Sequence, residues 1–314
     1  MAPRFSPRRE LGRTGFHATR IGAGDLADAS LTFETLVATL RRALDFGLNL
    51  VDTAPGYEDG LSERVVGAAL AGRREGVFVI DKIDHFDRPV APQIAASLER
   101  LGLDSADAFV FHGVSELELY RALTAPGGLW NELEAARRAG KCRVIGLSSH
   151  HPDVLEAALA DRRSDLLMFP VGPFVDARYI EHVLPRCRDA GVGSVCFKTF
   201  GAGKLLGDTS GYNRPLVDRP RGKLSSGGTD DATPATLPRL DVATCVRFTL
   251  TLDPDVALLG MSFPNEQDAA LAAAESFIAL SAAELEDVRR RAAVAMQHKG
   301  ACWWNPPDGL DGAG

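Results

Sequence analysis

Four residues within the first 112 positions of the chain combine types and spacing that suit proton transfer. Asp52 stands at the end of an apolar run, and Tyr57 follows it by a few residues. Lys82 directly follows the next apolar run, and His112 directly follows the one after that. A tyrosine hydroxyl is a useful proton donor near neutral pH only where a cation or a buried acid–base network lowers its pKa. A lysine held by an aspartate would supply that cation.

The apolar runs alternate with helical patterns along the chain. The runs are β-branched and apolar on both faces, as in strands buried within a parallel sheet, and they cover residues 19–23, 48–52, 77–81, 107–111, 143–147, 166–169, 192–197 and 256–259. Helical patterns cover residues 33–46, 62–71, 90–101, 129–139, 152–159, 177–190, 241–251 and 266–274. Eight strand–helix units in succession favour an α/β fold of the closed (β/α)8 TIM barrel type. An open doubly wound sheet would need a phosphate loop with a third glycine after Gly22-Ala-Gly24.

In such a barrel the carboxyl ends of the strands form the rim that carries the active site. Asp52, Tyr57, Lys82 and His112 are therefore expected to meet at one rim. We predict that Lys82, held by Asp52, lowers the pKa of Tyr57 and makes it the general acid. His112 would orient a carbonyl oxygen or relay the proton. The chemistry that suits this set is proton delivery to a carbonyl oxygen while hydride arrives at the carbon.

Composition excludes several functional classes. The chain has 314 residues, a net charge of −7, 45% hydrophobic and 25% charged residues, which is typical of a globular protein. The acidic balance argues against a nucleic-acid binder, and no apolar run reaches the roughly 18–20 residues of a membrane helix. Scattered cysteines without a C-x-x-C pair indicate reduced thiols, a cytoplasmic location and no metal site; they are Cys142, Cys187, Cys196, Cys245 and Cys302. No pattern specifies an oligomeric state.

We interpret residues 1–314 as a single barrel domain. Residues 1–9 read as a loose leader before an N-terminal β-hairpin within residues 10–24. The segment 204–240 has no periodicity, as in a lid-like loop. An extra C-terminal helix begins with a capping box at Ser281.

The tail, residues 299–314, carries Trp303 and Trp304, which either cover the substrate pocket or dock the tail to the barrel. His150 and His151 are interpreted as caps of the helix that begins at Pro152, and not as metal ligands.

The sequence resembles the aldo-keto reductase family over almost its whole length. The motifs that carry the resemblance are the hairpin 10–24, Asp52…Tyr57…Ser62-Glu63, Lys82, His112, Gly140-Lys-Cys-Arg-Val-Ile-Gly-Leu-Ser148, the stretch 191–203 and Val256-Ala-Leu-Leu-Gly260. The resemblance implies an NAD(P)H-dependent oxidoreductase that reduces an aldehyde, ketone or sugar carbonyl. Its small-molecule substrate would meet the tetrad Asp52, Tyr57, Lys82 and His112.

The resemblance also implies a set of cofactor-binding residues. Ser148 would contact the nicotinamide amide, and Phe197 would stack on the nicotinamide ring. The remaining positions lie beside the cofactor, its pyrophosphate or its adenosine phosphate; they are Gly24, Asp52, Phe200, Gly201, Gly203, Lys204, Leu205, Gly260 and Ser262. The lid-like loop would close over the pyrophosphate, with Arg219, Arg221 or Lys223 as partners.

Four departures from the family pattern weaken the expected grip on the cofactor. Ser149 and Met168 stand where the family has amide side chains that bind the nicotinamide, and Ala270 where an asparagine holds the adenine. Glu266 stands where an arginine often binds the 2′-phosphate. A carboxylate repels that phosphate but accepts a hydrogen bond from a free 2′-hydroxyl, so NADH is favoured over NADPH.

Two other functions remain open on the same barrel. One is a redox-neutral acid–base enzyme that carries out elimination or isomerisation, which the weakened nicotinamide contacts allow. The other is a regulatory subunit that binds a nucleotide without much turnover. The intact tetrad argues against the regulatory subunit.

Overall fold

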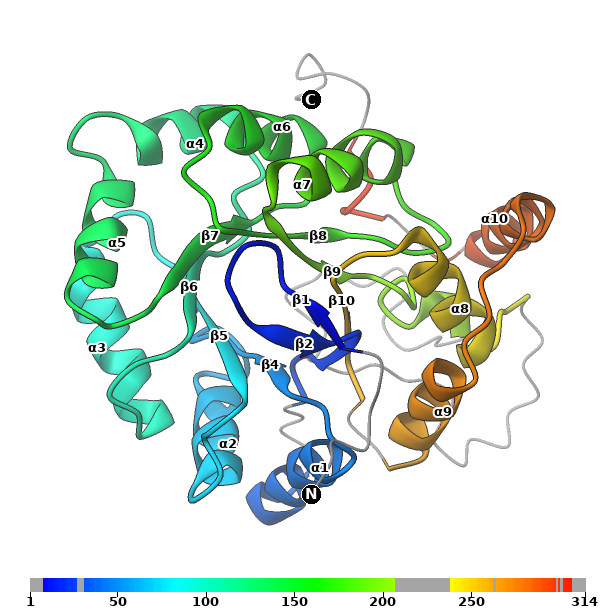
Figure 1. The fold of residues 1–314 in the computed structure, drawn as a ribbon, viewed down its shortest axis with the longest axis horizontal. Helices are drawn as coiled ribbons and strands as arrows, with labels where there is room; N and C mark the ends of the chain where they lie inside the picture. The colour runs from blue at the N-terminus through cyan, green and yellow to red at the C-terminus, as the bar shows by residue number, and fades with distance from the viewer. Residues whose placement is uncertain are drawn as a thin grey trace.

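The computed structural model describes residues 8–26, 31–206, 238–261, 264–297, 299 and 302–306, and for residues 264–266 it describes the backbone only. Within these ranges the chain forms a closed barrel of parallel strands with helices packed around its outside (Figure 1). The predicted (β/α)8 barrel is therefore confirmed, together with the N-terminal hairpin and the additional C-terminal helix.

Each barrel strand coincides with one of the predicted apolar runs. In chain order the strands are β3 (Ile21–Ala23), β4 (Leu50–Asp52), β5 (Phe78–Ile83), β6 (Ala108–Phe111), β7 (Val144–Ser148), β8 (Leu166–Pro170), β9 (Gly193–Phe197) and β10 (Val256–Leu259). Each pairs in parallel with its neighbours in sequence, and β10 closes the barrel by pairing with β3. Because all these strands run in the same direction, their carboxyl ends lie at one rim.

Helices follow the strands where the periodicity predicts them. They are α1 (Phe33–Asp45), α2 (Leu61–Leu70), α3 (Val90–Leu101), α4 (Leu117–Thr124), α5 (Leu129–Arg138), α6 (Pro152–Asp161), α7 (Leu184–Ala190), α8 (Val242–Leu252), α9 (Pro264–Glu275) and α10 (Ala282–Met296). A π-helical turn, η1 (Tyr179–Val183), leads into α7, and a 3₁₀ turn, η2 (Lys204–Leu206), follows β9. Helix α4 has no counterpart among the predicted helices, because only Tyr120 and Leu123 of this short helix are buried.

Side-chain caps set the beginnings of the first and last helices. At α1 the Thr32 hydroxyl accepts a hydrogen bond from the Thr35 backbone N–H at 3.3 Å. At α10 the predicted capping box is present, with Ser281 and Glu284 each accepting from the other's backbone N–H. These contacts satisfy N–H groups that have no partner within the helix.

The inside of the barrel holds an apolar cluster of its own. Its members on the strands are Leu50, Phe78, Ile80, Ala108, Val110, Val144, Leu166, Met168, Val195, Val256 and Leu258. Side chains alternate between the two faces of a strand. The next inward positions after Leu50 on β4 and Ile80 on β5 are therefore Asp52 and Lys82. The apolar filling stops one layer below the rim, and charged residues begin there.

The N-terminal hairpin closes the opposite end of the barrel. Strands β1 (Arg8–Glu10) and β2 (His17–Thr19) pair antiparallel, and Figure 1 shows them lying across the barrel centre. In the turn, Gly12 has a φ of 50°, and a Cβ there would lie 2.3 Å from the backbone nitrogen of Gly193. Only glycine allows this approach. With this end plugged, a site inside the barrel opens at the carboxyl ends of the strands.

Several sequence predictions fall wholly or partly outside the described residues. Residues 1–7 of the leader, 207–237 of the lid-like loop and 307–314 of the tail are among them, and so are Arg219, Arg221 and Lys223. The first hairpin strand begins at Arg8, so the last two residues of the predicted leader belong to the hairpin.

Candidate active site

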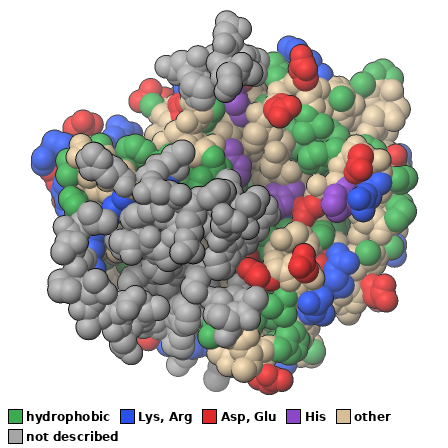
Figure 2. Space-filling model, turned by 180° about the vertical axis from the view of Figure 1, so that it is seen from behind, with side chains coloured by type: hydrophobic (Ala, Val, Ile, Leu, Met, Phe, Trp, Pro, Cys, Tyr) green, Lys and Arg blue, Asp and Glu red, His purple; other side chains and the backbone are tan. Residues whose placement is uncertain are grey.

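The four predicted catalytic side chains are brought together at the carboxyl ends of three adjacent strands. Asp52 is the last residue of β4, and His112 directly follows β6. Lys82 lies within β5, because β5 continues to Ile83 and pairs with β6 there; the expectation that Lys82 follows the strand is wrong, since the strand extends two residues past its predicted end at 81. Figure 2 views the face opposite the hairpin, where histidine side chains gather near the middle.

Asp52 and Lys82 form a buried ion pair. Lys82 Nζ lies 2.6 Å from Asp52 Oδ1 and donates to the backbone oxygen of Thr53, also at 2.6 Å. Both side chains are only 2% exposed. Burial alone would lower the pKa of Lys82, but the charge of Asp52 and its hydrogen bond, together with the charges of Tyr57 and Asp81, outweigh burial and raise the pKa, so the lysine stays protonated. Burial raises the pKa of Asp52 against the opposing charge of Lys82.

Tyr57 lies over this pair on a tight loop. Its half-buried ring has Lys82 Nζ 4.5 Å from its centroid. Left-handed backbone at Glu58, Asp59 and Gly60 turns the chain from this loop into α2. The Thr53 hydroxyl, which donates to Ser62 at 2.9 Å, ties the loop to that helix.

The predicted lowering of the pKa of Tyr57 is wrong for the described structure. Burial raises the pKa of Tyr57, while the charge of Lys82 and a hydrogen bond from it act in the predicted direction without prevailing. The carboxylates of Asp52 and Asp25 raise it further. Burial of the tyrosine depends on how the loop packs, which the sequence pattern does not encode.

Asp84 is a site residue that the sequence reasoning missed. Its Oδ1 lies 2.6 Å from His112 Nδ1, and its Oδ2 accepts from the Gly56 backbone N–H at 2.6 Å. The His112 ring meets the Tyr57 ring edge-on, with the centroids 5.5 Å apart. In the sequence, an aspartate just after Lys82 is indistinguishable from a solvated loop charge.

The proposed nicotinamide positions differ in what their side chains do. Ser148 is buried at the end of β7, and its hydroxyl accepts from the Gly113 N–H at 2.8 Å. The Ser149 hydroxyl serves a local turn, accepting from the His151 N–H at 3.0 Å. Met168 fills the barrel interior. Neither Ser149 nor Met168 presents an amide.

Phe197 and His150 form an aromatic pair at the end of β9. Phe197 is half-buried, and the two ring centroids are 5.1 Å apart. Burial, helped by the charge of Lys198, lowers the pKa of His150 to about 3, so this ring is neutral near pH 7. His151 caps α6 as predicted, with Nδ1 accepting from the Asp153 N–H at 3.3 Å, whereas the prediction that His150 also caps this helix is wrong.

The segment after β9 forms a tight turn. Gly201, Ala202 and Gly203 have positive φ angles, and Phe200, Lys204 and Leu205 are buried. Thr199 is 1% exposed, and its hydroxyl has no hydrogen-bond partner among the described residues. Gly24 and Gly260 lie nearby at strand ends, where the Gly24 N–H donates to the oxygen of Leu259 at 2.8 Å. Ser262 and the side chain of Glu266 lie outside the described part of the chain.

Lys299 links the two ends of the long segment that follows η2. This fully buried side chain donates through Nζ to the oxygens of Lys204, at 2.7 Å, and Pro238, at 3.0 Å. The Leu240 N–H also donates to the oxygen of Leu205 at 2.8 Å. We call these contacts the Lys299 clamp. Beside it, a hollow of about 650 Å³ lies between η2, α8 and α9 and is lined in part by Leu206, Leu240 and Ala273.

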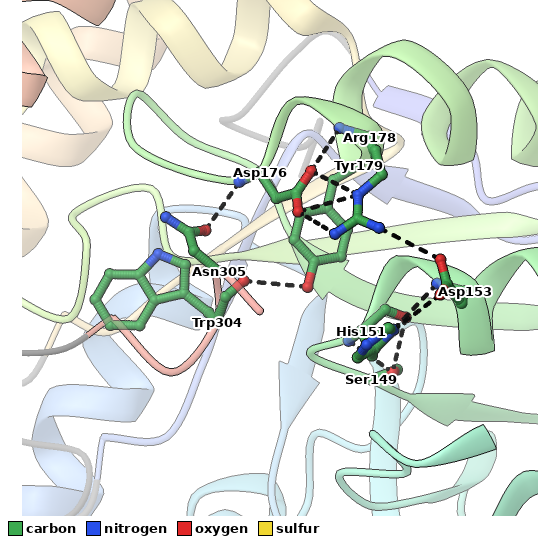
Figure 3. Close-up of polar contacts among 8 residues, drawn as sticks. All are labelled: Ser149, His151, Asp153, Asp176, Arg178, Tyr179, Trp304 and Asn305. Atoms are coloured by element: carbon green, nitrogen blue, oxygen red, sulfur yellow. Dashed lines mark hydrogen bonds and ion pairs between the residues drawn. The ribbon is translucent and has the colours of Figure 1, made fainter. Parts of the chain in front are cut away.

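The described part of the tail docks against the barrel (Figure 3). Trp304 is fully buried, and its Nε1 donates to the oxygen of Phe174 at 2.9 Å. The Tyr179 hydroxyl donates to the oxygen of Trp304 at 3.1 Å, and Asn305 accepts from the Asp176 N–H at 2.8 Å. Of the two roles left open for the tryptophans, Trp304 therefore has the docking role.

Neither a metal-binding cluster nor a membrane-spanning helix is found among the described residues. No cluster of three or more His, Cys, Asp or Glu side chains is placed to hold a metal ion. None of the described helices has the length and apolar character that crossing a membrane requires.

Comparison with known proteins decides the family. The sequence profile described as the Aldo/keto reductase family matches residues 20–288. The chain belongs to this family. It is 29% identical over 219 residues to the NADH-specific methylglyoxal reductase of Escherichia coli (strain K12), an alignment that covers 63% of this chain. The chain spans less than two thirds of that reductase's length, 66%.

Solved structures share the fold. The holo form of aldo-keto reductase AKR11C1 from Bacillus halodurans superposes with a TM-score of 0.68 at 24% identity, covering 93% of this chain and 99% of that one. An aldo-keto reductase from Klebsiella pneumoniae in complex with NADPH gives a TM-score of 0.64 at 22% identity, covering 87% and 91%. At this level of identity the likeness concerns the fold alone.

Proposed function

We propose that this member of the aldo/keto reductase family reduces an aldehyde or ketone to the alcohol with a reduced nicotinamide cofactor, with Tyr57 as the general acid. The observation that carries the proposal is the buried pair under Tyr57. Lys82 Nζ lies 2.6 Å from Asp52 and 4.5 Å from the centroid of the Tyr57 ring, at the open rim of the barrel. A fixed cation beside a phenol stabilises the phenolate that remains after proton donation.

The residues at the rim fit a nicotinamide dinucleotide in two respects. The half-buried ring of Phe197, which pairs with His150, offers a flat apolar surface at the same rim of the barrel as the tetrad. The Thr199 hydroxyl, which has no hydrogen-bond partner among the described residues, and the turn at 201–203 follow Phe197 in the chain, and such turns with positive φ suit a phosphate group. The fit is weaker at the nicotinamide amide, because Ser149 and Met168 stand where the family has amide side chains that hydrogen-bond it.

The tetrad residues divide the work. A reduced nicotinamide bound at this rim would supply the hydride for the carbonyl carbon. Tyr57 donates its proton to the carbonyl oxygen, and Lys82 stabilises the phenolate that results. Asp52 holds Lys82 in place and balances its charge inside the barrel. His112, neutral because burial lowers its pKa, lies edge-on to Tyr57, beside the reacting oxygen.

Turnover of one generic aldehyde tests this function. We expect purified protein to oxidise NADH or NADPH in the presence of 4-nitrobenzaldehyde or methylglyoxal, followed by the absorbance of the reduced nicotinamide. Tyr57→Phe should lower the rate by a factor of about 10²–10⁴. Cofactor binding, measured by fluorescence, should be unchanged. Tyr120→Phe is the matched control, since the Tyr120 hydroxyl donates a hydrogen bond to Asp161 at 2.9 Å, between helices α4 and α6. Tyr57→Phe that keeps more than half of the wild-type rate would refute the assignment.

For the cofactor we propose a preference for NADH. Support comes from the sequence, in which Glu266 replaces a phosphate-binding cation, and from the NADH-specific Escherichia coli relative. The NADPH bound in the Klebsiella pneumoniae structure is the counter-example. The test is kcat/KM with each cofactor for the wild type and for Glu266→Arg. A wild-type preference of more than about tenfold for NADPH, or no gain with NADPH in Glu266→Arg, would contradict the proposal.

A redox-neutral reaction is the second candidate, and the observation that favours it is the engagement of Ser149 in a local turn. Substrate consumption without a change in nicotinamide absorbance would support it. For the location we propose the cytoplasm, which the five free cysteines support.

A further inference from the structure

Asp84 joins the imidazole of the site to the loop that carries the tyrosine. One carboxylate oxygen lies 2.6 Å from His112 Nδ1, and the other accepts from the Gly56 backbone N–H at 2.6 Å. The two side chains are 13% and 20% exposed, so these hydrogen bonds are largely shielded from water. Gly56 immediately precedes Tyr57. The position of Asp84 therefore fixes His112 and the tyrosine loop relative to each other.

The charges around Asp84 determine which nitrogen of His112 carries the proton. Burial alone would raise the pKa of Asp84, but the hydrogen bonds from His112 and Gly56, together with the charges of His112 and Lys82, outweigh it and lower the pKa. The ionised carboxylate only accepts hydrogen bonds, so His112 Nδ1 must be the protonated nitrogen. Asp84, Asp52, Lys82 and Tyr57 all lie close to His112, and burial with the charge of Lys82 lowers its pKa against the two carboxylates. The imidazole is neutral near pH 7.

A neutral imidazole with its proton on Nδ1 has a lone pair on Nε2. His112 Nε2 makes no hydrogen bond to any residue that the structure describes. This nitrogen is therefore available to a ligand as an acceptor. A hydroxyl group of an alcohol or of Tyr57 can donate to it, whereas a bare carbonyl oxygen cannot.

We propose that Asp84 is a positioning residue that holds His112 in the Nδ1–H form, so that Nε2 accepts a hydrogen bond from a hydroxyl at the reacting oxygen. The inference rests on the proposed function and adds a consequence to it. The alcohol form of the substrate gains a hydrogen bond at His112 that the carbonyl form lacks. The equilibrium constant fixes the ratio of kcat/KM in the two directions, so the preference appears in the separate binding constants of alcohol and aldehyde.

Asp84→Asn reverses this arrangement without changing the shape of the side chain. Both partners of Asp84 are donors, and an amide has one acceptor oxygen. The backbone N–H of Gly56 cannot become an acceptor, so the amide oxygen stays with it and the amide N–H₂ faces His112. Nδ1 must then be the lone-pair nitrogen, and the proton moves to Nε2.

The first measurement needs no turnover. Nitrogen-15 correlation spectra of the imidazoles report the tautomer. Among the signals of the seven histidines, that of His112 is the one that disappears in His112→Gln. We expect an Nδ1–H form of His112 in the wild type and an Nε2–H form in Asp84→Asn. An Nε2–H form in the wild type would overturn the proposal even if Asp84→Asn does not fold.

The second measurement is kinetic, with 4-nitrobenzaldehyde as substrate and 4-nitrobenzyl alcohol as product inhibitor. In Asp84→Asn the inhibition constant of the alcohol should rise roughly threefold to tenfold, as expected for one lost hydrogen bond, while the KM of the aldehyde does not rise. Asp87→Asn is the matched control, because that exposed side chain contacts only Arg88, at 3.5 Å, among the interactions described for it. Equal changes for alcohol and aldehyde would mean a general structural role. Absence of turnover in the wild type would instead reject the proposed function and leave the tautomer test standing.

Discussion

Lys82→Met removes the cation of a buried ion pair and tests both stability and function. The variant leaves Asp52 without its partner in a position that is 2% exposed, and it leaves the oxygen of Thr53 without the hydrogen bond that Lys82 donates. Removing one member of a buried pair costs about 3–5 kcal/mol. For a chain of 314 residues the unfolding entropy is about 0.66 kcal/mol/K, so the melting temperature should fall by roughly 5–8 °C.

The activity should fall by about 10²–10⁴, since Tyr57 then lacks the charge that stabilises its phenolate. Exposed Lys141→Met is the matched control and should change neither quantity. Calorimetry and aldehyde turnover provide the two readouts.

A repair variant separates the two effects of Lys82. In Asp52→Leu/Lys82→Met no charge is left inside the barrel, so most of the stability should return; the unpaired oxygen of Thr53 keeps a deficit of about 1–3 kcal/mol. The activity should stay lost. A melting temperature of Lys82→Met equal to that of the wild type would refute the buried-pair reasoning. Activity that returns in the double variant would refute the catalytic role of Lys82.

Three further predictions concern other parts of the barrel. The folded protein binds a proton at His150 less readily than the unfolded chain, because the pKa falls from 6.5 to about 3; stability should therefore decline as pH falls through this window, on the order of 2–4 kcal/mol, and His150→Gln should flatten the curve of melting temperature against pH. Gly146→Ala would place a Cβ 1.8 Å from the oxygen of Leu166, and denaturant titration should show a loss of about 3 kcal/mol or more; a loss below about 1 kcal/mol would contradict the close approach of β7 and β8. Trp304→Ala should cost about 3–5 kcal/mol in the same assay, clearly more than Trp303→Ala, since only Trp304 is fully buried; equal losses would count against tail docking.

The strand order made the tetrad predictable, but the surroundings of the tetrad could not be predicted from the sequence. Asp52 and Lys82 end inward-facing series whose alternation is visible in the sequence, so their meeting follows from the parallel barrel. The direction of the Tyr57 pKa depends on how much water the folded loop excludes, and no residue pattern reports that. Asp84 acts through a contact between two loops, which periodicity does not encode.

The cofactor residues show the same division. Phe197 lies at the predicted rim because it ends a strand. Ser149 was assigned by its place in a motif, yet its hydroxyl bonds the backbone two residues later. Short hydroxyl side chains often make such local turns, so their orientation cannot be read from position alone.

The Lys299 clamp makes the barrel largely independent of how much chain lies between Leu206 and Pro238. The clamp holds the two flanking backbones together through Lys204, Pro238 and the pair formed by Leu205 and Leu240. The entropic cost of closing a flexible connection grows only with the logarithm of its length, about 0.6 kcal/mol for each doubling. This point of the chain is thus an insertion site. Evolution or design can add a whole domain there without changing how the barrel strands pair at the catalytic rim.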